Sequence, residues 1–200
     1  MSEAVDTVPQ RALAELIADI SRPRLAGALL GRLVNPPVIG LLIAWLMRSP
    51  MRARWMTTRT TRLHARLLRL SRGRLRRSWL FAAGQPVLAL TTTGRRTGRA
   101  RTTAVAAFTH RGTLAIAGMN LGLERNPGWS YNLIDIPQAL ISVNHETIPV
   151  FARPARGGQH EELWQRWLTL QPSAEAFATL AGRDIPIFVL EPRPDQPEGD

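Results

Sequence analysis

The chain of 200 residues is 44% hydrophobic and carries a formal net charge of +11, and all 26 of its basic residues are arginine. This length and composition are typical of one globular domain with an additional segment, and they exclude a disordered chain. The sequence has no cysteine, which excludes a disulfide, a thiolate metal site and a cysteine nucleophile. The opening residues, MSEAVDTVPQ, lack the basic and apolar regions of a secretory signal, so we expect a cytoplasmic location.

The charges are unevenly distributed along the chain. No aspartate or glutamate occurs from Ile20 to Leu123, whereas nineteen of the arginines lie there. Arginine stays charged and offers a planar fork of donors that fits phosphate and carboxylate groups. We therefore expect a strongly positive face whose partner is a phosphate-bearing ligand, a nucleic acid or an anionic membrane surface.

Two unlike helical segments are expected before residue 80, and residues 1–59 are assigned to an N-terminal helical extension. The stretch Leu25 to Pro50 is the most apolar, but Arg32 and the break at residues 35–37 divide it into runs too short for one membrane span. The sequence from Trp55 to Trp79 predicts a basic amphipathic helix. It suits either an anionic membrane surface, which would place the protein at the inner face of the cell membrane, or packing of its leucines on the core with a solvated arginine face.

From about residue 80 the pattern changes to short β-type runs, at residues 86–94, 101–108, 113–119, 138–143, 147–154 and 184–192. Helices are expected at residues 128–134, with Asn126 as N-cap and Pro127 in the first helical position, at 158–170, and at 173–181 before Gly182. Short antiparallel strands with helices inserted late predict an α+β fold built on a small antiparallel barrel over residues 60–192, with a flexible tail at 193–200.

The turn between the first two strands, TTTGRRTGRAR at residues 91 to 101, is a candidate anion site. A glycine turn can expose backbone amides, and arginine side chains add bidentate, charge-assisted bonds to phosphate or carboxylate. A solvated basic hairpin explains the same residues equally well. The phosphate-binding P-loop and the dinucleotide fingerprint Gly-x-Gly-x-x-Gly are both absent, which excludes those two modes of binding.

Three motifs resemble a known family. LALTTTGRRTGRARTT, GMNLGLERNPGWSYNL and RDIPIFVLEP, in this order and spacing, are similar to the deazaflavin-dependent nitroreductase and quinone reductase family of split β-barrel proteins. The resemblance runs from about Thr61 to Pro192. It implies a deazaflavin-dependent oxidoreductase that uses coenzyme F-420, an 8-hydroxy-5-deazaflavin with a phosphodiester and a polyglutamate tail, with flavin mononucleotide (FMN) as the alternative ligand.

The resemblance also implies which residues contact the cofactor. The phosphate and the first acidic groups of the tail would be held by Arg95, Arg96, Thr97, Gly98 and Arg101. The ring would be bordered by Thr103, Ala104 and Val105, by the second glycine-bearing loop and by two residues of the following helix: Met119, Asn120, Leu121, Gly122, Trp129 and Asn132. From its chemistry alone, Trp129 is equally well explained as a core aromatic or as a pocket wall.

The implied reaction is hydride transfer from the reduced coenzyme to a quinone, enone or nitro compound. The acceptor would lie near Ala106, Ser130, Tyr131 and Phe177. Family members tend to carry tyrosines around the acceptor, whereas Ala106, Ser130, Gln171, Ala174 and Phe177 stand in these places here, which favours a lipophilic acceptor. The candidate proton donors are Tyr131, the only tyrosine, and water. Water is favoured, because nothing in the sequence activates Tyr131, and no other catalytic residue is identified.

The sequence also bears on a metal site and on two other classes of function. No metal site is expected, because the four histidines, His64, His110, His145 and His160, show no ligand-like spacing. A nucleic-acid-binding module would explain the arginines, but neither an aromatic-interleaved strand face nor a helix-turn-helix is found. A non-catalytic deazaflavin-binding or partner-docking protein stays open, with the segment at residues 25–59 as its docking surface.

Overall fold

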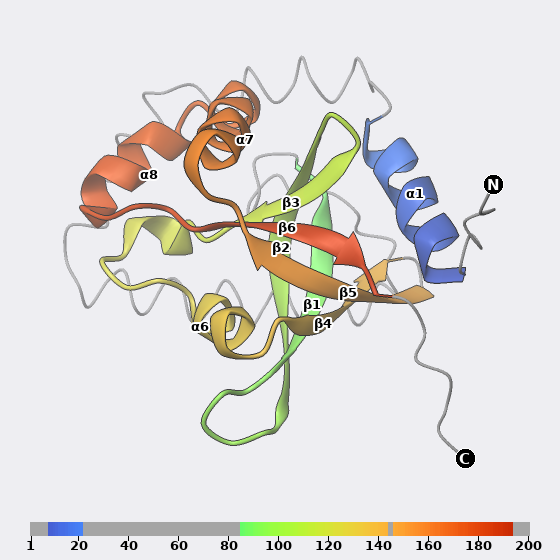
Figure 1. The fold of residues 1–200 in the computed structure, drawn as a ribbon. Helices are drawn as coiled ribbons and strands as arrows, with labels where there is room; N and C mark the ends of the chain where they lie inside the picture. The colour runs from blue at the N-terminus through green and yellow to red at the C-terminus, as the bar shows by residue number, and fades with distance from the viewer. Residues whose placement is uncertain (1–7, 22–84, 144–145, 194–200) are drawn as a thin grey trace.

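A closed antiparallel barrel forms the centre of the protein (Figure 1). The computed structural model describes residues 8–21, 85–143 and 146–193. Within these ranges the strands pair in the order β1-β2-β3-β6-β5-β4, and β4 pairs with β1 to close the barrel. The strands are β1 (Val87–Thr93), β2 (Ala100–His110), β3 (Thr113–Ala117), β4 (Gln138–Val143), β5 (Glu146–Pro154) and β6 (Ile187–Pro192). The predicted split-barrel fold is thus confirmed, and closure leaves no exposed sheet edge.

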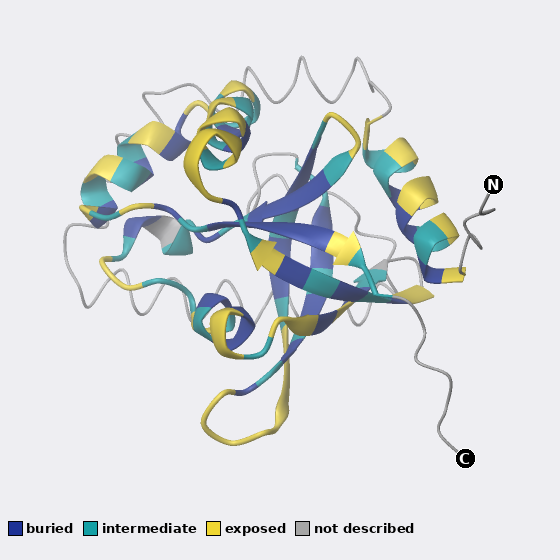
Figure 2. Cartoon of the chain, in the orientation of Figure 1, coloured by how far each residue is buried: buried dark blue, intermediate teal, exposed yellow. Residues whose placement is uncertain are grey.

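Alternating side chains fill the interior of the barrel. Leu88 and Leu90 of β1 are almost fully buried and belong to the same cluster as Val105 of β2 and Phe188 of β6. Because successive strand residues point to opposite faces, their neighbours lie on the outside. β6 departs from strict alternation, since residues 187–190 are all buried. Its outward-facing residues are covered by helices (Figure 2).

Two late helices cover one outer face of the barrel. α7 (Gly157–Leu170) packs Leu163 and Trp167 against Ile187 and Val189 of β6. α8 (Ala174–Ala181) follows and ends at Gly182, whose φ of 59° is the left-handed conformation that glycine adopts without strain. The predicted stop at this glycine is confirmed. The two helices turn the outer surface of β2, β3 and β6 into a second hydrophobic core.

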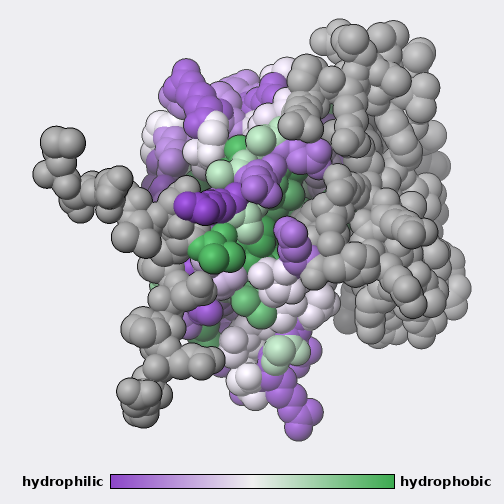
Figure 3. Space-filling view, turned by 90° about the vertical axis from the view of Figure 1, so that its right-hand side faces the viewer, coloured by the Kyte–Doolittle hydropathy of each residue, from purple (hydrophilic) through white to green (hydrophobic). Residues whose placement is uncertain are grey.

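An N-terminal helix, α1 (Val8–Ser21), packs against the barrel from the other side. Leu13 and Leu16 are buried in the cluster that fills the barrel, and each such side chain stabilises the fold by about 1.5 to 3 kcal/mol. The hydroxyl groups of Ser21 and Thr109 share a hydrogen bond of 2.9 Å. On the face that carries α1, hydrophobic side chains at the centre are interspersed with hydrophilic ones (Figure 3). α1 therefore provides an N-terminal helical addition to the barrel, as expected.

α6 (Gly128–Asp135) and the short 3-10 helix η1 (Asn120–Gly122) lie on the path from β3 to β4. The prediction of Asn126 as N-cap is wrong by one residue. Pro127 is still extended, with ψ of 147°, and is itself the N-cap. The Pro127 carbonyl accepts hydrogen bonds from both the amide and the hydroxyl of Ser130, so a backbone oxygen and a serine organise the first turn.

The two expected N-terminal segments, Leu25 to Pro50 and Trp55 to Trp79, lie outside the described residues. The domain boundaries at residues 59/60 and 192/193 therefore stay predictions. In the part of the chain that is described, no helix combines the length and the apolar character needed to cross a membrane.

Candidate functional site

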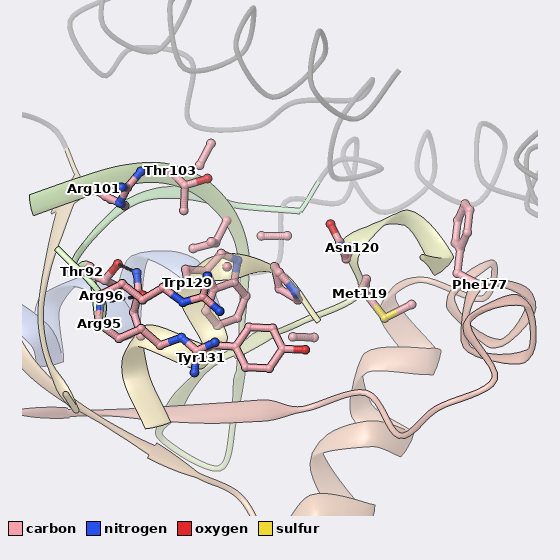
Figure 4. A pocket seen from close by; sticks show the side chains of 18 of the residues that line it. Thr92, Arg95, Arg96, Arg101, Thr103, Met119, Asn120, Trp129, Tyr131 and Phe177 are labelled. Carbon is pink, nitrogen blue, oxygen red and sulfur yellow. Dashed lines mark hydrogen bonds between the residues drawn. The ribbon is translucent and has the colours of Figure 1, made fainter. Parts of the chain in front are cut away.

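A cavity of about 720 Å³ lies where the β1–β2 hairpin, η1, α6 and the end of α7 come together (Figure 4). Its wall contains most of the predicted cofactor residues, namely Arg95, Arg96, Thr97, Arg101, Thr103, Ala104, Val105, Met119, Asn120, Trp129 and Asn132. Of the predicted acceptor residues it contains Ala106, Tyr131 and Phe177. The fold thus brings the first two of the three motifs to one hollow.

The hairpin loop between β1 and β2 is held in shape by its own backbone. The amides of Gly94, Thr97 and Gly98 donate to carbonyl oxygens within the loop. A Cβ on Gly94 would lie 3.0 Å from Nε of Arg101 and 3.1 Å from the Arg99 carbonyl oxygen, so only glycine lets the loop close this tightly. Most amides of the loop are therefore already used, and the expectation of exposed amides converging on an anion is corrected. The guanidinium groups are the donors that remain.

These guanidinium groups are exposed and mostly lack acidic partners. Arg95 approaches Asp135 at 3.8 Å, and its Cζ lies 5.0 Å from the centre of the Tyr131 ring. Arg96, Arg99 and Arg101 are exposed, and within the described ranges none of the three forms an ion pair with a carboxylate. Arg96 and Arg101 belong to the cavity wall, whereas Arg99 does not. One end of the cavity is therefore cationic, and among the described residues Asp135 beside Arg95 is the only carboxylate paired with its arginines.

Asn132 fixes this cationic loop to the rest of the protein. The side chain is 7% exposed. Its Nδ2 donates to Oγ1 of Thr92 on β1 at 3.0 Å, and its Oδ1 accepts from the Arg95 amide at 3.2 Å. One α6 side chain thus ties together a strand, a loop and a helix. Asn132 lines the cavity as predicted, but both of its polar atoms are bonded to the protein.

Two aromatic residues of α6 complete this part of the wall. Trp129 contacts Phe188 of the barrel edge-on, with ring centres 5.6 Å apart, and also lines the cavity. Both explanations of this residue, core aromatic and pocket wall, therefore apply. The Tyr131 ring is half-buried, and its hydroxyl points away from Arg95 (Figure 4).

Arg183, which the sequence did not single out, organises the opposite wall. Its guanidinium donates to the carbonyl oxygens of Leu123 at 3.0 Å, Gly118 at 3.2 Å, Met119 at 3.4 Å and Arg125 at 3.5 Å, and of its neighbour Asp184 at 3.1 Å. Burial lowers the pKa of this guanidinium, and interaction with Tyr131 partly opposes the shift. Arg183 is the first residue of the third motif, but an arginine next to an aspartate, here Asp184, is typical of a surface ion pair. The sequence therefore does not identify it as part of a site.

The far end of the cavity is largely apolar. Ala104, Ala106, Ala117, Met119 and Phe177 line it together with Trp167 of α7, and Gln171, the C-cap residue of α7, adds an uncharged amide. Figure 4 shows the arginines on one side and Phe177 on the other, with Met119 and Asn120 between them. Trp167 has the helical spacing of an ordinary core residue, so its sequence context carries no signal of a place in the wall. The cavity therefore joins a charged compartment to an uncharged one.

Three predicted residues do not line the cavity, namely Ser130, Gly98 and Gly122. Ser130 is completely buried, and its hydroxyl donates to the Pro127 carbonyl at 2.7 Å, so it has no free group for an acceptor. Gly98 forms the hairpin turn with φ of 63°. Gly122 packs against α8, where a Cβ would lie 3.0 Å from the Phe177 carbonyl oxygen. Leu121 lies in η1, and its side chain is outside the part of the chain that the structure describes.

The link through Asn132 leads to a stability prediction. Asn132→Ala should lower the free energy of unfolding by about 2 to 3 kcal/mol, because it removes two hydrogen bonds and leaves the buried Thr92 hydroxyl without its partner. Urea unfolding measures the change. The control Ser142→Ala removes an exposed bond to Thr147 and should cost less than about 0.5 kcal/mol. Equal effects of the two variants would contradict the special role of Asn132.

Comparison with known proteins identifies the family. A sequence model described as F420H(2)-dependent quinone reductase matches residues 60–192. The chain is 29% identical over 137 residues to an F420H(2)-dependent quinone reductase of Mycobacterium tuberculosis strain ATCC 25618 / H37Rv, covering 66% of this chain and 89% of that protein. A protein of the same description from Mycobacterium tuberculosis strain CDC 1551 / Oshkosh matches with the same figures. A solved structure described as an F420-H2 dependent reductase (FDR-A) is 25% identical, with a TM-score of 0.48, over 53% of this chain and 94% of that one.

The matched region contains every strand of the barrel and every described residue of the cavity wall. The chain therefore belongs to the F420H(2)-dependent quinone reductase family, a family of oxidoreductases that depend on coenzyme F420.

Proposed function

We propose that the protein binds coenzyme F420 in this cavity, with the anionic tail on the hairpin arginines and the ring toward the apolar end, and reduces an electron-poor lipophilic acceptor. The observation that carries the proposal is that one cavity combines two features. Arg96 and Arg101 line one end and lack carboxylate partners within the described ranges, and the other end is an uncharged compartment. A ligand with a charged tail and a flat neutral ring matches both compartments. Family membership supports the same ligand.

The cationic end suits a chain of anionic groups better than a single phosphate. Arg95, Arg96 and Arg101 line the wall, and Arg99 extends the exposed charge beyond it. Each guanidinium can form a bidentate, charge-assisted pair with phosphate or carboxylate. FMN ends in one phosphate and would leave part of this charge unused, so the phosphodiester and polyglutamate tail of coenzyme F420 are favoured.

Reduction of a quinone needs a hydride and a proton, which together convert the quinone to a hydroquinone. The bound coenzyme supplies the hydride, and the protein binds and orients the reactants and excludes water. Tyr131 is the protein group best placed to supply the proton. It lines the cavity, its ring lies beside Arg95, and Arg183 is close enough to interact with it electrostatically. We propose Tyr131 as proton donor, with water as the alternative.

Binding at the hairpin is tested with Arg96→Ala. Loss of one charge-assisted contact should weaken coenzyme F420 binding about tenfold or more at low salt, with a smaller effect on FMN. Fluorescence titration of both ligands gives the dissociation constants. Arg156→Ala removes an exposed arginine that does not line the cavity and should change neither. If the two variants bind coenzyme F420 equally well, the tail is not held at the hairpin.

Catalysis is tested by mixing the protein with reduced coenzyme and a panel of quinones, enones and nitro compounds, and following the return of the deazaflavin absorbance. Tyr131→Phe should lower kcat about 100-fold, the scale of general acid catalysis, with an unchanged coenzyme dissociation constant. An unchanged kcat would assign the proton to water. Absence of turnover across the panel, with intact coenzyme binding, would favour a coenzyme-binding protein without reductase activity.

The acceptor is proposed to be lipid-soluble and taken from an anionic membrane surface. The apolar end of the cavity and the basic amphipathic sequence at Trp55 to Trp79 support this. Flotation of the full-length chain with vesicles should carry the protein upward when the vesicles contain anionic lipid, and much less with neutral vesicles or at high salt. A chain that stays at the bottom of the gradient with both kinds of vesicle would contradict membrane association.

A further inference from the structure

One arginine of the hairpin already has an anionic partner. Nη1 of Arg95 lies 3.8 Å from Oδ2 of Asp135, and the two side chains are 36% and 47% exposed. Charge-assisted hydrogen bonds between an arginine and a carboxylate are about 2.7 to 2.9 Å long, so this contact is loose and is screened by water. The cavity wall includes Arg95 but not Asp135. The carboxylate is therefore a partner of Arg95 that does not itself line the cavity.

Asp135 occupies an unfavourable position in its own helix. It is the last residue of α6, and the last turn of this helix contains no basic residue. The C-terminal end of a helix carries partial negative charge, so a carboxylate there destabilises the helix unless a cation lies nearby. Arg95, which comes from the hairpin, is the cation that the structure places beside it. A ligand that takes Arg95 away leaves Asp135 at the helix end without this cation.

Arg95 can change partners without moving its backbone. Its amide is fixed by the side chain of Asn132 at 3.2 Å. Its Cζ lies 5.0 Å from the centre of the Tyr131 ring, and Figure 4 shows the two side chains next to each other. The other two arginines of the wall form no ion pair with a carboxylate within the described ranges. An anion that enters the cavity therefore meets two guanidinium groups without such a partner and a third that is shared with Asp135.

We propose that Asp135 is a resident counter-ion of Arg95 that competes with the anionic tail of coenzyme F420, and that it thereby limits the affinity of the site and speeds dissociation of the coenzyme. This inference rests on the proposed function, because it needs the tail to lie on the hairpin. Two effects act in the same direction. The tail must displace Asp135 from Arg95, and in the complex the displaced carboxylate lies near both the helix end and an anionic ligand. A ligand with a single phosphate can be held by the other two arginines, so its binding is weakened less.

The test is the variant Asp135→Asn, which keeps the size of the side chain and removes its charge. Fluorescence titration and stopped-flow displacement give the dissociation constant and the dissociation rate of oxidised coenzyme F420, and FMN is the second ligand. The variant should bind the coenzyme about two- to fivefold more tightly at low salt, the range expected from an exposed ion pair, mainly through slower dissociation. The gain should be smaller for FMN, and it should shrink at high salt.

Glu191→Gln is the matched control. Glu191 pairs with Arg153 at 3.1 Å, and both side chains are 48% exposed. Neither residue lines the cavity, so this variant makes the same change in net charge away from the site and should bind the coenzyme like the unchanged chain. Arg95→Ala alone should weaken binding. In that background Asp135→Asn should lose most of its effect, because the two residues act as a pair.

Three results would overturn the inference. Unchanged or weaker coenzyme binding in Asp135→Asn would mean that the carboxylate does not compete with the tail. An equal gain in Glu191→Gln would assign the effect to overall charge. An undiminished gain in the Arg95→Ala background would exclude Arg95 as the group through which Asp135 acts. Failure of the unchanged chain to bind the coenzyme at all would instead reject the proposed function, and this inference with it.

Discussion

The site depends on the hydrogen bonds that Asn132 makes with Thr92 and with the Arg95 amide. The hydrogen bonds within the loop set its shape. Because the hairpin arginines are exposed and repel one another, these bonds alone do not fix the loop beside the cavity. The buried amide of Asn132 anchors the base of the loop to α6 and to the last buried residue of β1. Because the Asn132 side chain is buried and fixed, the strongly charged loop stays ordered before a ligand neutralises it. This order reduces the entropic cost of binding.

The division of the cavity into a charged and an uncharged end follows from the fold. The hairpin extends beyond the barrel, where solvent screens its arginines, whereas α7 and α8 cover the outer face near β3 and β6 and keep it apolar (Figure 1). The path from η1 to α6 connects the two ends and supplies Met119, Asn120 and Trp129. A ligand with unlike halves is thereby oriented by the site as a whole, since turning it round would bury its charges against alanines and a phenylalanine.

Much of this could be predicted from the sequence, and the exceptions have physical reasons. Alternation and turn residues predicted the strands, and the arginine-rich hairpin is found in the cavity wall, because both are local patterns. The role of Asn132 depends on partners 37 and 40 residues away, and no local pattern reveals such pairs. Ser130 was expected to face an acceptor, but helix geometry turned its hydroxyl back to Pro127. Trp167 and Arg183 were missed because an apolar helical position and an Arg-Asp pair are usually structural.

Arg183 joins the segment between α8 and the last strand to the loop around η1 through carbonyl oxygens alone. Such oxygens neither gain nor lose a proton in the range that proteins encounter, unlike the carboxylates that hold most arginines. Acidification therefore cannot break the hydrogen bonds of Arg183 by protonating their acceptors. Added salt cannot weaken an ion pair here, because the acceptors carry no net charge. The wall formed by Met119 and Asn120 should keep its shape in acidic or saline surroundings that loosen the ion pairs elsewhere on the surface, such as the one between Arg153 and Glu191.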